Sequence, residues 1–247
     1  MRLAILSDIH ANLHALQAVW QDVLTQQPDR IFCLGDLVGY GAHPNEVIAF
    51  LKAQEIPTVL GNYDEGVGFD LDDCGCAYRT AEERRRGDAS LQWTRAHTTP
   101  DYKAYLRGLV PNLRFEEPRP TLLLVHGSPR KINEYVFEDR PQATFQRLAA
   151  LAGTDLLLFG HTHLPYQKRI ERTLFVNAGS VGKPRGGDPR AVYVVVDLTF
   201  DPSVEFRRVK YDVEGAAAAV RGSGLPPVFA DLLLSGGVEA AVEGGPS

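Results

Sequence analysis

The first sixty residues alternate between short apolar runs and amphipathic helical patterns, and this alternation restricts the fold more than any other feature of the chain. Apolar runs at residues 3–6, 31–34 and 58–60 are separated by helical patterns that begin near Asn12 and Pro44. Strands that alternate with helices form parallel sheets with right-handed crossovers, and both faces of such a sheet are buried. We therefore expect a βαβαβ unit at the start of the chain.

The pattern changes after this unit. Residues 65–110 carry polar helical patterns with few apolar anchors, and we interpret them as a helical insertion or cap. Strand-like runs then return at residues 121–125, 155–159, 173–176, 191–196 and 204–209, with one helix near residues 142–151. We expect an α/β domain with two facing sheets over residues 1–233, and the small-residue composition of residues 234–247 predicts a flexible tail.

Composition argues against several other classes of protein. The chain has 26 basic and 31 acidic side chains and a net charge of -5, which does not favour nucleic-acid binding. The run Arg84-Arg85-Arg86 is flanked by acidic residues and is typical of a solvated helix face. No stretch approaches the ~20 apolar residues that cross a bilayer, and the first apolar run is too short for a signal peptide. Three cysteines, an odd number, fit a reducing cytoplasm.

Polar residues follow the apolar runs at five places, where the carboxyl ends of strands are expected. They are Asp8-Ile9-His10, Gly35-Asp36, Gly61-Asn62, His126-Gly127 and Gly160-His161-Thr162-His163. Ligands bind at this edge of open α/β sheets, because the loops there converge. Imidazole nitrogens with carboxylate and amide oxygens suit Mn²⁺, Fe²⁺, Co²⁺, Ni²⁺ or Zn²⁺ better than Ca²⁺. Seven candidate ligands are too many for one ion, so we predict two ions that share Asp36 and a bridging hydroxide that attacks phosphorus.

These residues resemble the motifs of the calcineurin-like metallophosphoesterase superfamily. The matching segments are Asp8-x-His10, Gly35-Asp36, Gly61-Asn62-x-Asp64, His126-Gly127 and Gly160-His161-x-His163. Two further segments, 36–41 and 177–182, resemble the small bacterial and archaeal phosphodiesterase branch. The resemblance implies a four-layer α/β/β/α sandwich of two mixed sheets. It also implies one metal held by Asp8, His10, Asp36 and His163, and another held by Asp36, Asn62, His126 and His161.

The chain departs from the family pattern at two positions. Larger phosphatases of the superfamily carry His where this chain has Tyr63, and many carry an acidic residue where it has Gly39. A tyrosine hydroxyl is a poorer proton donor near neutral pH than an imidazolium, so we expect a preference for phosphodiesters or good leaving groups. The resemblance also implies that Asn62 lies near a phosphate oxygen. Three roles are open for Asp64, which are to take part in catalysis, to orient a neighbouring residue or to cap the following helix.

We expect a hydrolase that acts on a small phosphorylated compound, and nucleotide-like phosphodiesters are the first candidate substrates. A phosphomonoesterase, a dinucleotide-polyphosphate hydrolase and a non-catalytic interaction scaffold of the same fold are the alternatives. Lys183 and Arg185 either contact a substrate phosphate or are solvated. Cys74 and Cys76 lie in a segment that could cover the site, although packing is the simpler reading. We assign no metal to His14, His43 or His97, and we expect Tyr102 and Tyr105 to pack the cap, with base stacking as the alternative.

Overall fold

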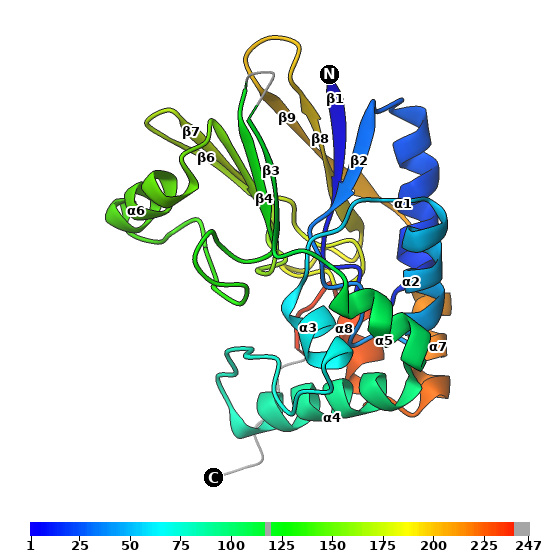
Figure 1. Cartoon of the computed structure of the whole chain (residues 1–247). Helices are drawn as coiled ribbons and strands as arrows, with labels where there is room; N and C mark the ends of the chain where they lie inside the picture. Colours follow the sequence, from blue (N-terminus) through cyan, green and yellow to red (C-terminus); the bar gives the residue numbers. More distant parts are fainter. Residues whose placement is uncertain (117–119, 240–247) are drawn as a thin grey trace.

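Two mixed β-sheets face each other in the computed structural model, which describes residues 1–116 and 120–239 (Figure 1). The first sheet has the order β2 (Arg30–Cys33), β1 (Arg2–Leu6), β8 (Ala191–Asp197) and β9 (Ser203–Val209). The second has the order β3 (Asn112–Phe115), β4 (Leu122–Val125), β5 (Leu156–Phe159), β7 (Thr173–Asn177) and β6 (Tyr166–Ile170). Strand β1 is parallel to β2, and β5 is parallel to both β4 and β7. The carboxyl ends of four strands, β1, β2, β4 and β5, therefore lead to one region of the molecule.

Helices complete a four-layer arrangement. They are α1 (Leu13–Thr25), α2 (Pro44–Ala53), α3 (Asn62–Gly68), α4 (Ala81–His97), α5 (Pro100–Arg107), α6 (Gln142–Ala152), α7 (Val213–Ser223) and α8 (Val228–Leu234). Helices α1 and α2 cover the outer face of the first sheet, and α6 covers the outer face of the second (Figure 1). The fold is thus the α/β/β/α sandwich that the family resemblance implies.

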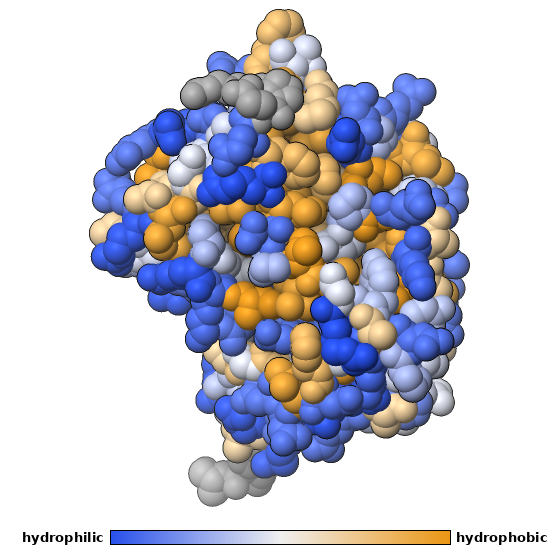
Figure 2. Space-filling model, viewed as in Figure 1, coloured by the Kyte–Doolittle hydropathy of each residue, from blue (hydrophilic) through white to orange (hydrophobic). Residues whose placement is uncertain are grey.

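The alternation of side chains along β1 shows how the layers are held together. Ala4 and Leu6 belong to the apolar cluster between the first sheet and its helices, whereas Leu3 and Ile5 belong to the cluster between the sheets. Successive side chains of a strand point to opposite faces, so a fully apolar strand fits a layer that is buried on both sides. Figure 2 shows the surface of the molecule from the side seen in Figure 1. Hydrophobic residues gather over the middle of this surface, and hydrophilic residues surround them.

The structure differs from the sequence-based expectation at several elements. Residues 58–60 do not form a strand, because only isolated bridges join Thr58 to Cys33 and Val59 to Val110. Pro57 precedes them and has no backbone N–H to donate to a longer ladder. Strands β3 and β6 and helices α7 and α8 were not predicted. Strand β6 lies at a sheet edge and carries exposed polar residues, so its sequence has no apolar run.

Residues 65–110 contain helices, as their pattern predicts, although residues 69–80 between α3 and α4 are not helical. Helices α4 and α5 occupy residues 81–107, and α3 packs against both. Tyr102 and Tyr105 pack against the apolar cluster of the first sheet, in agreement with their expected role as anchors. The division into a domain and an insertion stays a prediction, and residues 240–247 of the predicted tail lie outside the described residues. Among the helices of the described residues, none has the length and hydropathy needed to span a membrane.

Candidate metal centre

All seven candidate ligands come together at the strand ends, although they are spread from residue 8 to residue 163. Asp8 and His10 follow β1, Asp36 follows β2, His126 follows β4, His161 and His163 follow β5, and Asn62 is the first residue of α3. Backbone hydrogen bonds fix the loops to one another. The N–H of His10 donates to the carbonyl of Asp36 at 2.9 Å, and the N–H of Gly160 donates to the carbonyl of His126 at 2.8 Å. The centre is therefore built on hydrogen-bonded loops.

Five of these residues have left-handed backbone conformations. Their φ angles are 51° for Asp8, 48° for His10, 53° for Asp36, 65° for His161 and 62° for His163. For a residue other than glycine, such a conformation costs of order 1 kcal/mol or more, and it persists only where the surroundings enforce it. Strain of this kind is concentrated at functional sites.

Asp8, His10 and His163 form a first trio of buried donors whose ligand atoms all lie within 4.8 Å of one another. His163 Nε2 lies 3.2 Å from Asp8 Oδ1 and 3.1 Å from His10 Nε2. The other carboxylate oxygen of Asp8 accepts hydrogen bonds from Ser7 Oγ at 2.5 Å and from the N–H of His161 at 3.0 Å. Asp8 is thereby oriented so that Oδ1 faces the two imidazoles.

Asp36, His126 and His161 form a second buried trio, whose ligand atoms also lie within 4.8 Å of one another. His126 Nε2 lies 3.2 Å from His161 Nδ1 and 3.0 Å from Asn62 Oδ1. The amide nitrogen of Asn62 donates to the carbonyl of Cys74 at 3.1 Å, so its oxygen is directed toward the second trio. Asn62 thus supplies a fourth donor there.

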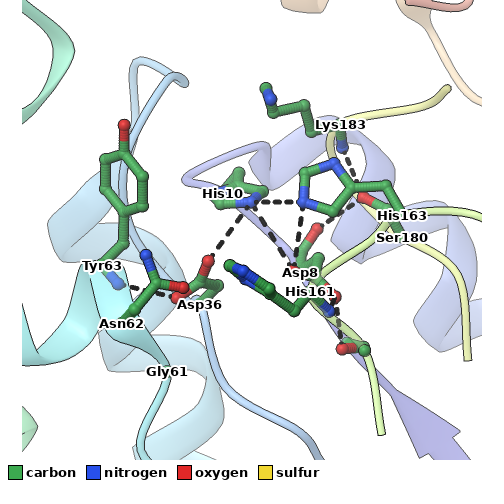
Figure 3. A network of polar contacts seen from close by, with 12 residues as sticks. Asp8, His10, Asp36, Gly61, Asn62, Tyr63, His161, His163, Ser180 and Lys183 are labelled. Atoms are coloured by element: carbon green, nitrogen blue, oxygen red, sulfur yellow. Dashed lines mark hydrogen bonds and ion pairs between the residues drawn. The ribbon is translucent and has the colours of Figure 1, made fainter. Parts of the chain in front are cut away.

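Asp36, a member of the second trio, lies between the histidines of that trio and the residues of the first (Figure 3). Its Oδ2 is 3.6 Å from His10 Nε2 of the first trio and 3.4 Å from His126 Nε2 of the second. Its Oδ1 accepts the backbone N–H of Tyr63 at 2.8 Å. One carboxylate oxygen is therefore fixed by the protein, while the other faces both trios.

Two of the histidines are oriented by backbone carbonyls. His10 Nδ1 lies 3.0 Å from the carbonyl of Val38, and His126 Nδ1 lies 2.7 Å from the carbonyl of Leu34. A carbonyl oxygen only accepts, so each Nδ1 carries a hydrogen and each Nε2 is the nitrogen that faces the centre. This is how proteins commonly orient metal-binding imidazoles.

The electrostatics of the centre favour cations. Burial lowers the pKa of His10 and of His161 to about 3, so both are neutral ligands at neutral pH. Burial also opposes protonation of His126, but Asp36 raises the pKa of this imidazole to about 10. Asp8 Oδ1, which faces His10 and His163, is buried and has no hydrogen-bond partner among the described residues. A nitrogen and oxygen donor set with such an unpaired carboxylate oxygen fits divalent first-row ions.

The structure gives Asp64 a supporting position. Its carboxylate is buried and accepts the N–H of Leu37 at 2.8 Å and the N–H of Gly61 at 3.1 Å. Asp64 therefore joins the loop of Asp36 to the start of α3, which carries Asn62. This arrangement favours the orienting and capping interpretation of Asp64.

Tyr63 and Gly39, the two departures from the family pattern, are in direct contact. A Cβ atom at position 39 would lie 2.3 Å from Tyr63 Cδ1, and Gly39 has a φ of +92°. The ring of Tyr63 is buried and packs edge-on against His10, with ring centroids 5.6 Å apart. In Figure 3 this ring extends away from the Asp36 carboxylate. The space that a side chain at position 39 would need is thus filled by Tyr63.

Several residues near the centre were assigned no role there from the sequence. Tyr135 packs over His161 with ring centroids 4.1 Å apart, and Cys76 Sγ lies 3.3 Å from Asn62 Nδ2. Ser180 Oγ donates to the carbonyl of Asp8 at 2.8 Å. Only Ser180 lies in a segment that the family resemblance had marked. The others arrive from loops whose sequences show no motif.

The remaining histidines lie outside both trios. His14 and His43 are neighbours with ring centroids 5.6 Å apart, and His97 stacks on Trp93 at 4.0 Å. The arginine run on α4 forms ion pairs, including Arg86 with Glu82 at 2.9 Å. These placements agree with the assignment of ordinary polar roles to these residues.

A fold of two sheets with this centre defines a class of phosphoesterases, and comparison with known proteins gives the family. Residues 1–201 match the model of the calcineurin-like phosphoesterase superfamily domain. The chain therefore belongs to this superfamily, and it is a hydrolase that acts on phosphoric ester bonds.

Two relatives cover most of the chain. The uncharacterized protein MJ0912 of Methanocaldococcus jannaschii is 31% identical, and the match covers 95% of this chain and 98% of the relative. Phosphodiesterase YfcE of Escherichia coli is 25% identical over 203 residues, which cover 80% of this chain and 88% of the relative. The similarity to YfcE is consistent with the small phosphodiesterase branch.

Solved structures share the fold over nearly the full length. A metallophosphoesterase from Sphaerobacter thermophilus is 30% identical with a TM-score of 0.77, and the match covers 96% of this chain and 99% of that one. The protein PH1004 from Pyrococcus horikoshii is 21% identical with a TM-score of 0.84, and the match covers 97% and 99%. The second match shows a common fold.

Proposed function

We propose that the chain binds two divalent metal ions and hydrolyses a phosphodiester of a small, nucleotide-like compound. One ion would be held by Asp8, His10, Asp36 and His163, and the other by Asp36, Asn62, His126 and His161. The position of Asp36 Oδ2 supports this proposal most strongly, because the oxygen lies 3.6 Å from a nitrogen of one trio and 3.4 Å from a nitrogen of the other. A single carboxylate can then serve both ions.

When bound, such a pair of ions lowers the pKa of a shared water molecule and neutralises charge on the phosphoryl group. The residues of the chain hold this arrangement in place. The N–H of Tyr63 fixes Asp36, and Asp64 fixes the loops of Asp36 and Asn62. Asn62 lies beside the second trio and would hold the second ion through its oxygen. Its amide nitrogen donates to the carbonyl of Cys74 and to Cys76 Sγ, so a hydrogen bond to a phosphoryl oxygen would replace one of these two.

The preference for a phosphodiester with a good leaving group rests on Tyr63. Its ring packs on His10 and its hydroxyl is directed away from Asp36, so it is poorly placed to protonate a leaving group at the centre. Tyr63 would then act through its backbone N–H and its packing. The name of the relative YfcE, a phosphodiesterase, also supports a diester substrate. A cytoplasmic location remains part of the proposal.

An assay with bis(p-nitrophenyl) phosphate tests the proposed function. The purified chain should hydrolyse this diester after addition of Mn²⁺ and lose the activity with a chelator. Its kcat on an alkyl phosphomonoester should be far lower than its kcat on the diester. Equal values would remove the reason for the diester preference, and absent turnover with every divalent metal would favour the scaffold alternative.

A further inference from the structure

A cavity of about 290 Å³ opens beside the first trio and extends away from it. His10 and His163 line it, whereas Asp36 and the other residues of the second trio do not. The cavity, here called the side pocket, is also lined by Lys183, Arg185 and the aromatic rings of Tyr40, Tyr78 and Phe229. Its volume is near the lower end of the range for small-molecule sites. The side pocket thus has room for a part of a substrate that lies beyond the phosphoryl group under attack.

Lys183 is placed in the side pocket by a loop that is fixed to the centre. The N–H of Lys183 donates to Ser180 Oγ at 2.8 Å, and Ser180 Oγ donates to the carbonyl of Asp8 at 2.8 Å (Figure 3). The N–H of Gly182 donates to the same carbonyl at 3.0 Å. A Cβ atom at position 182 would lie 1.7 Å from the carbonyl oxygen of Ile9, so the loop approaches as closely as it does only because this residue is glycine. The position of Lys183 relative to the first trio is therefore defined.

The ammonium of Lys183 has no carboxylate within ion-pair distance among the described residues. Its Nζ lies over the ring of Tyr40, 4.0 Å from the centroid, and the side chain is half-buried. Burial lowers the pKa of Lys183 to about 8, and Arg185 adds to the shift. The guanidinium of Arg185 likewise forms no ion pair within the described ranges and reaches only the carbonyl of Thr162, at 3.4 Å. Two cations without counter-ions beside a metal centre suit an anionic ligand.

The aromatic residues and histidines of the side pocket suit a flat, partly polar group. Tyr40 packs edge to face against His10 and against Phe229, with centroids 5.1 Å apart in both pairs, so the aromatic lining begins directly beside the first trio. His14 Nδ1 and His43 Nε2 also line this cavity, and both atoms are buried without a hydrogen-bond partner among the described residues. Aromatic rings stack on nucleobases, and unpaired nitrogens can bond to their polar edges.

We infer that the side pocket binds the nucleoside part and a second phosphate group of a nucleotide substrate, and that Lys183 is the main ligand of this second phosphate. The inference rests on the proposed function, because the phosphoryl group under attack would lie at the metals. Two divalent ions would already meet the charge of that group, whereas Lys183 and Arg185 are available for another. The substrate class is thereby narrowed to nucleotide phosphodiesters that carry a second phosphate group.

Equilibrium binding to the Mn²⁺-loaded protein tests the inference without turnover. The probes are α,β-methylene adenosine diphosphate, which resists hydrolysis between its phosphates, and adenosine monophosphate. The wild-type protein should bind the diphosphate at least about tenfold more tightly. Lys183→Met should abolish this preference and Lys183→Arg should retain it. Lys210→Met serves as the matched control, since Lys210 is exposed and does not line the side pocket.

Three results would overturn the inference. They are equal binding of both probes by the wild-type protein, an unchanged preference in Lys183→Met, and an equal loss of affinity for both probes in that variant. The last result would place Lys183 at the phosphate under attack. Lys183→Gln provides a second neutral variant in case Lys183→Met does not fold. If the preference is present but the aryl diester is not hydrolysed, the proposed function fails and the subsite stands.

Discussion

Asp36 Oδ1 accepts a hydrogen bond from the backbone N–H of Tyr63 at 2.8 Å, and this contact directs Oδ2 toward His10 of the first trio and His126 of the second. The contact joins the loop after β2 to the first turn of α3. A shared ligand for two metal ions must face two directions at once while the protein fixes its orientation. Asp36 meets both conditions, and the proposal for the centre depends on it.

Asp36→Asn should remove the charge that the two trios share while it retains the size of the side chain. We expect fewer than two bound ions per chain and a loss of at least about 100-fold in diester hydrolysis. Metal analysis after dialysis, together with kcat/KM, measures both effects. The exposed Asp201→Asn is the control, and full metal content in Asp36→Asn would contradict the role of a shared ligand.

Metal binding should stabilise the folded chain. A ligand at 100 times its Kd adds about 2.7 kcal/mol to the free energy of unfolding, and for a domain of this size that corresponds to roughly 5–10 °C in Tm. Differential scanning fluorimetry with Mn²⁺ and with a chelator measures the shift. His163→Ala should reduce it, because this residue belongs to the first trio. A Tm that does not respond to any divalent metal would argue against a preformed centre.

Gly39→Ala should destabilise the fold by roughly 2–4 kcal/mol, since the new methyl group would overlap Tyr63 and φ is +92°. Gly224→Ala is a matched control, because its φ is +89° but its nearest atom would lie 3.7 Å away. We expect that control to cost only about 1–2 kcal/mol. Urea unfolding gives each value.

The same contact predicts coupling between positions 39 and 63. In the double variant Gly39→Ala, Tyr63→Ala the overlap is gone, so the loss of stability should be smaller than the sum of the single losses by about 1 kcal/mol or more. Additive losses would show that the two departures from the family pattern are independent.

Asp64→Ala should leave the N–H groups of Leu37 and Gly61 buried without acceptors and reduce the free energy of unfolding by roughly 2–4 kcal/mol. Asp64→Asn retains one acceptor oxygen and should lie between wild type and Asp64→Ala. If Asp64→Asn were fully stable and metal-loaded yet inactive, Asp64 would have a direct chemical role instead. Urea unfolding and metal analysis of the two variants separate these outcomes.

Asp22 should contribute stability that depends on pH. Its carboxylate accepts hydrogen bonds from Arg207 at 3.0 and 3.1 Å and from Tyr193 Oη at 2.7 Å, and the Arg207 hydrogen bonds hold its pKa below the usual value. The folded pKa lies below the unfolded one, so this contribution is present above about pH 4 and is lost as the pH falls through the folded pKa. Asp22→Asn should cost about 1–2 kcal/mol at pH 7 and less at pH 3 in urea unfolding. An equal cost at both values would contradict the linkage.

Six of the seven ligands were predictable from the sequence because each follows a buried strand, whereas Asn62 follows the apolar run at residues 58–60, which forms only isolated bridges. Apolar runs mark β1, β2, β4 and β5, and the polar residues that follow these strands therefore lie at the shared edge of the sheets. The position of Asp36 between two trios, in contrast, depends on distances between loops that are far apart in sequence. No local pattern encodes them.

Elements that depend on tertiary contacts escaped prediction for the same reason. Strand β6 has an exposed polar centre and exists because it pairs with β7, whereas residues 58–60 are apolar but find only single bridges. The side pocket combines residues from the start of α1, from α8 and from the loop of Lys183. Its charge and shape could be read only after these parts were placed together.

A crystal structure of the chain grown with Mn²⁺, with anomalous diffraction data, tests the central claim most directly. Two anomalous peaks are expected roughly 3.5–4 Å apart, one at each trio, with Asp36 bound to both ions. Peaks elsewhere on the molecule, or none at Asp36, would contradict it.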